Sequence, residues 1–296
     1  MKKSIPSLLI AVIFLVIIGF IFHTTTTRSP EKKETTKTTP QPQAKIAGKE
    51  TAKKEITTPT LFIHGYSGGK SSFGPMIDRF SSKNLGSRSL VITVKPDGNL
   101  AIQGTFDKYA KNPLIQLLFA DNKSSMVNQS EWIKDAMIDL KNVYHIEEVN
   151  LVGHSMGGVS LTDYIEKNAT NKSVPSVKKV ALLGAPLNGL SIGDDGKTPY
   201  DLTPTGPAMQ SERYAELLKN SSVISNKLEV LNVAGDTKDG RKSDGSVSIA
   251  SALSGKFIYK RAASYKEKII TGKEGKHSNL HDSEKVDKWI ADFLWD

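Results

Sequence analysis

A serine framed by two glycines stands in this chain between an apolar run and a helix-forming stretch. Val149–Val152 is typical of a buried strand and leads directly into Gly153-His154-Ser155-Met156-Gly157. A serine on so sharp a strand-to-helix turn needs near-absent side chains two positions to either side, because the backbone otherwise cannot close. The start of the following helix favours negative charge that develops beside the serine. The segment therefore predicts a nucleophile turn.

The Gly-x-Ser-x-Gly pattern occurs three times, so the surroundings have to separate the candidates. Ser191 stands in a loop rich in glycine and aspartate, well beyond its nearest strand, which argues against a nucleophile there. Ser67 does follow a strand, but the segment His64–Gly69 fits better as another part of the same site. Ser155 is therefore the predicted nucleophile.

Short apolar runs alternate with amphipathic stretches after residue 59. Gln129–Tyr144 carries its apolar residues at helical spacing, and a helix is expected from Ser155 to Asn168. Besides Val149–Val152, strands are expected at Thr60–His64, Leu90–Val94, Val180–Leu183, Leu228–Val233 and Lys256–Tyr259. The lysine- and tyrosine-rich stretch Lys256–Thr271 is expected to be a solvated edge strand. Buried strands that alternate with amphipathic helices predict an α/β fold, a mostly parallel sheet with helices on both faces.

These motifs resemble those of the α/β-hydrolases, and residues 59–296 are similar in particular to the cell-surface hydrolases of low-GC Gram-positive bacteria. The resemblance implies the α/β-hydrolase fold and the chain order nucleophile, acid, base. It also implies an oxyanion hole built from two backbone N–H groups. These would belong to Met156, directly after the nucleophile, and to Tyr66, in the His-Gly-x turn after an early strand.

The acid is expected after the strand Leu228–Val233. Asp244 opens an Asp-Gly-x-Val sequence that resembles the acid turn of many lipases, so it is the favoured candidate. Asp236 lies nearer the strand end and remains the alternative. Asp239 fits a solvated turn.

Two histidines, His277 and His281, lie downstream of Asp244. In the family the catalytic histidine stands on the loop before the last helix, and in similar lipases a His-x-x-Leu pattern leads into it, with a valine about nine positions on. His277 satisfies this register with Leu280 and Val286. His281 is close to the helix start and remains the alternative.

The first 58 residues differ in composition from the rest. Leu8–Phe22 is uninterrupted apolar or glycine behind Met-Lys-Lys, and it is followed by no small-x-small sequence. Residues 1–22 are therefore predicted to be an uncleaved signal anchor, with a cleaved signal peptide as the alternative. Residues 23–58 are rich in Thr, Lys and Pro and hold no aromatic residue, which predicts a disordered stem. The hydrolase domain is then 59–296.

The net charge of +9 lies mostly in that N-terminal part, where residues 1–58 hold ten basic and four acidic side chains. The rest of the chain carries only +3, so no nucleic-acid partner is expected. The chain has no cysteine, which excludes thiolate catalysis and zinc sites with sulfur ligands. Walker, dinucleotide-binding and EF-hand patterns are absent from the sequence, and neither a cofactor nor a metal is expected.

The sequence predicts a serine hydrolase held at the membrane by its N-terminal segment, with its catalytic domain outside the cell, or secreted if that segment is cleaved. A carboxylesterase or lipase-like reaction on a small-molecule or lipid-like ester is favoured by analogy with the fold. Leu187–Ser222 is expected to form a lid-like insertion with apolar side chains for an acyl pocket. The alternatives are an acyltransferase that uses the same residues, a non-catalytic surface binding module, and a domain that faces the cytoplasm.

Overall fold

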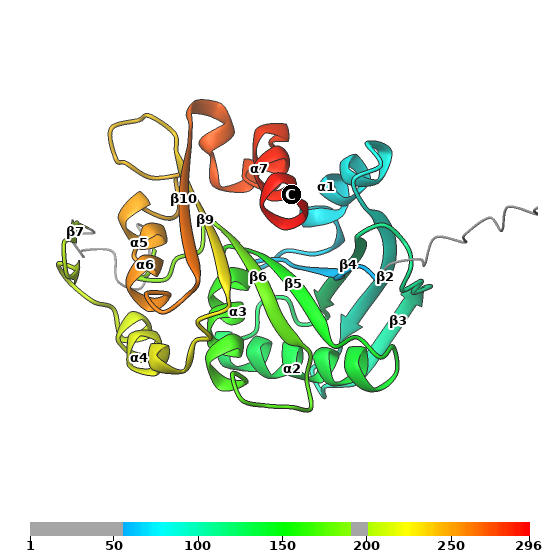
Figure 1. Ribbon diagram of the computed structural model, residues 1–296. Coiled ribbons are helices and arrows are strands. Elements are labelled where there is room, and N and C mark those ends of the chain that lie inside the picture. The colour runs from blue at the N-terminus through cyan, green and yellow to red at the C-terminus, as the bar shows by residue number, and fades with distance from the viewer. Residues whose placement is uncertain (1–55, 191–200) are drawn as a thin grey trace, which may run out of the picture. The chain divides into compact units, whose positions relative to one another are not determined.

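The computed structural model describes residues 56–190 and 201–296, where strands alternate with helices (Figure 1). The predicted signal anchor, nearly all of the predicted stem and Ser191 lie outside the described residues. Within those two ranges no helix has the length and apolar character needed to span a membrane.

The strands are β1 (Thr60–Ile63), β2 (Ser87–Val94), β3 (Leu100–Gly104), β4 (Pro113–Phe119), β5 (Glu148–His154), β6 (Ser176–Leu183), β7 (Leu202–Thr203), β8 (Gly206–Pro207), β9 (Glu229–Asp236) and β10 (Ser264–Thr271). The helices are α1 (Lys70–Ser82), α2 (Met126–Asn142), α3 (Met156–Lys167), α4 (Glu212–Asn220), α5 (Ile249–Leu253), α6 (Gly255–Ile258) and α7 (Glu284–Trp295). Three short 3₁₀ turns are η1 (Ser221–Val223), η2 (Gly272–Gly275) and η3 (His277–Asn279).

Eight strands form one sheet in the order β10-β9-β6-β5-β1-β4-β2-β3. Every neighbouring pair is parallel except β2 and β3, which run antiparallel. The predicted mostly parallel sheet is therefore confirmed. Because their strands share one direction, the segments that follow β1, β5, β6, β9 and β10 emerge at the same edge of the sheet.

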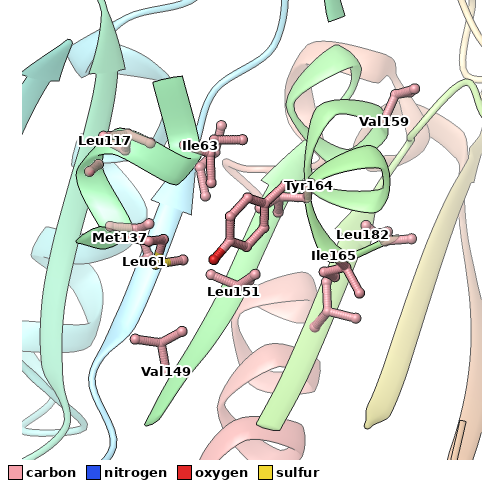
Figure 2. Packing of buried hydrophobic residues seen from close by; sticks show 14 of the residues in the cluster. Leu61, Ile63, Leu117, Met137, Val149, Leu151, Val159, Tyr164, Ile165 and Leu182 are labelled. Carbon is pink, nitrogen blue, oxygen red and sulfur yellow. The ribbon is translucent and has the colours of Figure 1, made fainter. Parts of the chain in front are cut away.

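Helices cover both faces of the sheet, α1 and α7 on one and α2, α3 and α4 on the other (Figure 1). Successive strand residues point to opposite faces, so Leu61 and Ile63 pack with α2 and α3 whereas Phe62 packs with α1 and α7. Figure 2 shows the first of these two cores, in which Tyr164 of α3 lies against residues of β1 and β5. Burial on both faces explains why the central strands are continuous apolar runs.

Several elements of the structure, among them α1, β3 and β4, were not expected from the sequence, and one expected strand is not formed. The predicted strand Lys256–Tyr259 is wrong, because Gly255–Ile258 forms α6 and buries Ile258 and Tyr259 in the core. A short apolar run fits a buried helical turn as well as a strand. The edge strand expected within Lys256–Thr271 is β10, and its lysine-rich sequence suits the edge of the sheet, where no other described strand pairs with one of its sides.

Part of the predicted lid-like insertion Leu187–Ser222 lies within the described residues. From residue 201 it forms the two-stranded β7–β8 pair and then α4. Ser211 caps α4 by accepting a hydrogen bond from the N–H of Tyr214, and the Tyr214 ring is completely buried. The side chain of Asn188 joins the start of the insertion to the segment just before α4, because its amide N–H donates to the Met209 carbonyl and its amide oxygen accepts the Ser211 N–H.

Candidate active site

Ser155 occupies the turn between β5 and α3 in a backbone conformation that residues other than glycine rarely adopt. Its φ is 54° and its ψ is −129°. A β carbon at Gly157 would lie 2.4 Å from the His64 carbonyl oxygen, and one at Gly153 would lie 2.8 Å from the Gly158 Cα. The two glycines of the motif are therefore required by close backbone contacts, as the sequence pattern predicts.

The side chains of Ser155, His277 and Asp244 form a continuous hydrogen-bonded chain. His277 Nε2 lies 2.9 Å from Ser155 Oγ, and His277 Nδ1 lies 2.7 Å from Asp244 Oδ2. Because a carboxylate only accepts, Nδ1–H donates to Asp244, which leaves Nε2 free to accept the serine hydroxyl proton. This arrangement has the geometry of a nucleophile, a base and the group that orients the base.

Asp244 reaches this position from the loop after β9. Its side chain is 1% exposed, and its second oxygen accepts the N–H groups of Ser246 at 2.9 Å and Val247 at 2.7 Å. These bonds fix the carboxylate and point its other oxygen at His277.

Asp236, the alternative acid, takes part in a different set of contacts. Its Oδ1 accepts the Lys238 N–H at 2.9 Å, and its Oδ2 lies 3.0 Å from Lys238 Nζ. The hydrogen bond from the Lys238 backbone is the main cause that holds the pKa of Asp236 below its usual value. Asp236 therefore caps its own turn and makes no hydrogen bond to His277 within the described residues.

His281, the alternative base, packs against His154 and forms no hydrogen bond with Ser155 or Asp244 within the described residues. Its Nδ1 is 3.6 Å from Asp282 Oδ2, and its ring packs edge-on against His154 at 4.7 Å between centroids. Burial lowers the pKa of His281. Among the described side chains, only His277 forms hydrogen bonds with both Ser155 and Asp244.

The His64-Gly65-Tyr66 turn lies directly against Ser155. A β carbon on Gly65 would stand 2.7 Å from Ser155 Cβ and 3.3 Å from Ser155 Oγ, so the backbone of this turn borders the serine hydroxyl. On the other side, the N–H of Met156 is the first of α3 and has no carbonyl of its own helix to pair with. The predicted donors, Tyr66 and Met156, thus belong to the two segments that flank Ser155.

Two side chains hold the Gly65 turn, and neither role is evident from the sequence. His64 Nδ1 donates to the Gly65 carbonyl at 2.8 Å, while its Nε2 accepts the Phe119 N–H at 3.1 Å. Burial lowers the pKa of His64, in keeping with this neutral form. The Asn122 side-chain amide donates to the Gly68 carbonyl at 2.7 Å, and the Asn122 backbone carbonyl accepts the Ser67 N–H at 2.8 Å. Ser67, the second serine of the pattern, therefore belongs to a clamped turn.

His154, directly before Ser155, is a further residue of the candidate site, and its contact could not be predicted from the sequence. Its side chain is buried, and its Nε2 lies 3.0 Å from the carbonyl oxygen of His277. The rings of His154 and His277 are 4.6 Å apart. Within the described residues, no group of three or more His, Asp or Glu side chains is arranged to hold a metal ion.

The sequence matches a family described as an alpha/beta hydrolase of unknown function (DUF915), over residues 47–296. Two bacterial proteins of known structure are similar over most of the chain. A Listeria innocua protein, the product of the gene lin2722, has 32% identity and a TM-score of 0.75 over 80% of this chain and 94% of that one. A Lactobacillus plantarum protein with the provisional name of cell surface hydrolase has 22% identity and a TM-score of 0.65 over 81% and 90%.

A more distant likeness is to the mature form of the Bacillus licheniformis lipase BlEst2. It has 14% identity and a TM-score of 0.50 over 81% of this chain and 92% of the lipase. Because the identity is low, this likeness shows only that the two proteins have similar folds. A comparison with curated proteins gave no match.

Proposed function

Because this chain belongs to the DUF915 family of α/β-hydrolases, we propose that it is a serine hydrolase that cleaves carboxylic esters through an acyl-enzyme. The observation that supports the proposal is the run of two hydrogen bonds from Ser155 Oγ through the His277 imidazole to the Asp244 carboxylate. A buried carboxylate that orients a histidine toward a strained serine serves nucleophilic attack on a carbonyl carbon.

In the proposed first half-reaction, Ser155 Oγ bonds to the ester carbonyl carbon and its proton passes to His277 Nε2. The carbonyl oxygen becomes an oxyanion that accepts hydrogen bonds from the backbone N–H groups of Tyr66 and Met156. When the intermediate collapses, the bond to the alcohol oxygen breaks. His277 returns the proton to that oxygen, and the alcohol departs.

In the second half-reaction, water loses a proton to His277 Nε2 and its oxygen bonds to the acyl carbon. Collapse breaks the bond to Ser155 Oγ, which takes the proton back, and the carboxylic acid is released. Asp244 accepts the hydrogen bond from Nδ1 throughout and stabilises the transient imidazolium.

Labelling with a fluorophosphonate tests the nucleophile, because this probe forms a covalent bond only with an activated serine. The wild-type protein should be labelled at Ser155, and Ser155→Ala should not be labelled at all. Ser67→Ala is the matched control, since Ser67 stands in the same sequence pattern and lies outside the hydrogen-bonded chain. An adduct that persists in Ser155→Ala would refute the proposal.

A series of nitrophenyl esters of increasing acyl length tests the ester specificity. We expect burst release of nitrophenol, which reports the acyl-enzyme. Labelling of Ser155 without turnover of any ester in the series would argue against carboxylester hydrolysis.

We also propose that the domain is tethered to the membrane and acts outside the cell. Support comes from the apolar segment Leu8–Phe22 and the polar stretch that follows it, and from the provisional name of the Lactobacillus plantarum relative. Protease treatment of intact Gram-positive cells that express the full chain should release the labelled domain into the medium. Protection of the domain until the cells are lysed would contradict this orientation.

A further inference from the structure

We propose that His154 is a positioning residue for the reaction, whose Nε2–H holds the backbone of the general base His277. This inference rests on the proposed function. His154 is the residue between Gly153 and Ser155 in the nucleophile motif, and its imidazole reaches the His277 carbonyl oxygen at 3.0 Å. The residue that precedes the nucleophile thus contacts the residue that activates it.

The contact matters because His277 stands on a short turn. The three-residue turn η3 begins at His277, and the Leu280 N–H lies 3.4 Å from the His277 carbonyl, which is a long hydrogen bond. The His277 N–H and its ring Nδ1 both donate to Asp244. Among the described residues, the His277 backbone therefore has one further hydrogen bond besides those to Asp244 and Leu280, and His154 supplies it.

The hydrogen bond to the His277 carbonyl oxygen determines the tautomer of His154. A carbonyl oxygen only accepts, so Nε2 must carry the proton. The side chain is 7% exposed and lies between the rings of His277 and His281, at 4.6 and 4.7 Å. Burial, followed by the proximity of His277, His281 and His64, keeps the pKa of His154 well below its usual value.

A neutral donor suits this position better than a charged one would. During the reaction His277 becomes an imidazolium, and a second cation 4.6 Å away would oppose the proton transfer from Ser155. A wholly apolar side chain could fill the same space, but it would leave the His277 carbonyl without this donor. A neutral histidine provides an N–H donor for the His277 carbonyl and fills the space beside the His277 ring without adding a positive charge.

The test compares two substitutions of similar size in the full-length protein. His154→Gln retains an N–H donor at about the distance of Nε2, whereas His154→Met retains the volume and lacks the donor. With nitrophenyl ester as substrate, we expect His154→Met to lower kcat by roughly 10- to 100-fold with KM within about twofold of wild type, since a small displacement of a catalytic group has this effect. His154→Gln should recover most of the loss.

His281→Phe is the control for disturbance of the ring cluster, because His281 packs on His154 without a hydrogen bond to Ser155 or Asp244. Its kcat should stay close to that of wild type. Thermal unfolding of each variant shows whether a loss of rate comes from a loss of fold. The inference is overturned if His154→Met is as active as wild type, or if folded His154→Gln is no more active than folded His154→Met.

The two proposals fail in different ways. If wild-type protein is neither labelled by fluorophosphonate nor active on esters, the proposed function is wrong. If wild-type protein is labelled and active while His154→Met shows the same kcat, the proposed function stands and the role of His154 alone is wrong.

Discussion

Asp244 and His277 are joined twice, because the Asp244 carboxylate lies 2.7 Å from the imidazole Nδ1 and the Asp244 carbonyl accepts the His277 N–H at 2.9 Å. The main-chain bond does not depend on the side chain at position 244. A change from carboxylate to amide should therefore alter the chemistry and leave the loop in place.

Asp244→Asn should lower kcat by about 10⁴-fold, because an amide that donates toward Nδ1 favours the wrong tautomer of His277. Asp236→Asn is the matched control, since Asp236 contacts Lys238 and makes no hydrogen bond to His277. Its kcat should stay within a few-fold of wild type. Burst kinetics on a nitrophenyl ester would measure both, and a larger loss in Asp236→Asn would assign the acid to that residue.

Gly65→Ala should reduce kcat by roughly 10- to 100-fold, since its new methyl group would stand 2.7 Å from Ser155 Cβ and displace either Ser155 or the proposed oxyanion turn. Gly69→Ala, in the same segment, is the control, because a β carbon there meets no atom within 4 Å. The rate of fluorophosphonate labelling reports the change at Ser155. Equal rates in the two variants would place the Gly65 turn outside the reaction.

Arg79→Met should lower the free energy of unfolding by about 3 kcal/mol, because it leaves the carboxylate of Asp287 buried without its partner. Arg79 Nε lies 2.5 Å from Asp287 Oδ2, and the Asp287 side chain is 5% exposed. The pair joins α1 to α7, and Arg79 also donates to the His281 carbonyl. Urea unfolding measures the loss.

Lys83→Met is the control for that experiment, since Lys83 and Glu284 form an ion pair between the same two segments on the surface. The decrease in the free energy of unfolding of Lys83→Met should be too small to detect by urea unfolding. A comparable decrease in the free energy of unfolding in Arg79→Met and Lys83→Met would mean that the burial of Asp287 contributes little to the effect of Arg79→Met.

Glu166 on α3 should make the protein less stable as the pH rises. Its side chain is buried, and neither carboxylate oxygen has a hydrogen-bond partner among the described residues. Burial, followed by the nearby Asp163 and Glu216, raises the pKa of Glu166 to about 9 from an ordinary value of 4.5. The folded state thus binds a proton that the unfolded state releases, so stability falls as the pH rises from about 4.5 through about 9.

Glu166→Gln should remove most of this dependence. At pH 8 its free energy of unfolding should exceed that of wild type by roughly 2 to 4 kcal/mol, and at pH 4 the two should agree. Urea unfolding at pH 4, 6 and 8 measures both curves. Parallel curves over this range would show that Glu166 does not retain its proton in the folded protein.

The sequence predicts those parts of the site that depend on nearby residues. Gly153 and Gly157 are needed because the turn around Ser155 brings backbone atoms together, and this requirement is visible in five consecutive residues. The parallel sheet follows from the alternation of apolar runs and amphipathic helices. The positions of Asp244 and His277 depended on resemblance, because nothing local to either residue shows that the two meet.

Contacts between distant segments could not be predicted. His64 accepts a hydrogen bond from the Phe119 N–H and His154 contacts the His277 carbonyl, and both bonds form only once segments far apart in the sequence come together. The expected edge strand Lys256–Thr271 contains β10, but the bounds of β10 could not be predicted, for another reason. Its one-sided pairing allows exposed lysines, so its sequence lacks the apolar run that marks a central strand.

The order of the parallel sheet also governs when the site can form. Ser155 follows the central strand β5, but the proposed base His277 stands after the edge strand β10, which among the described strands pairs only with β9. A partly folded or still growing chain can therefore contain the whole nucleophile turn and remain inert. Ester turnover during refolding should accordingly lag behind the recovery of helical structure, and it should mark the moment when the last strand joins the sheet.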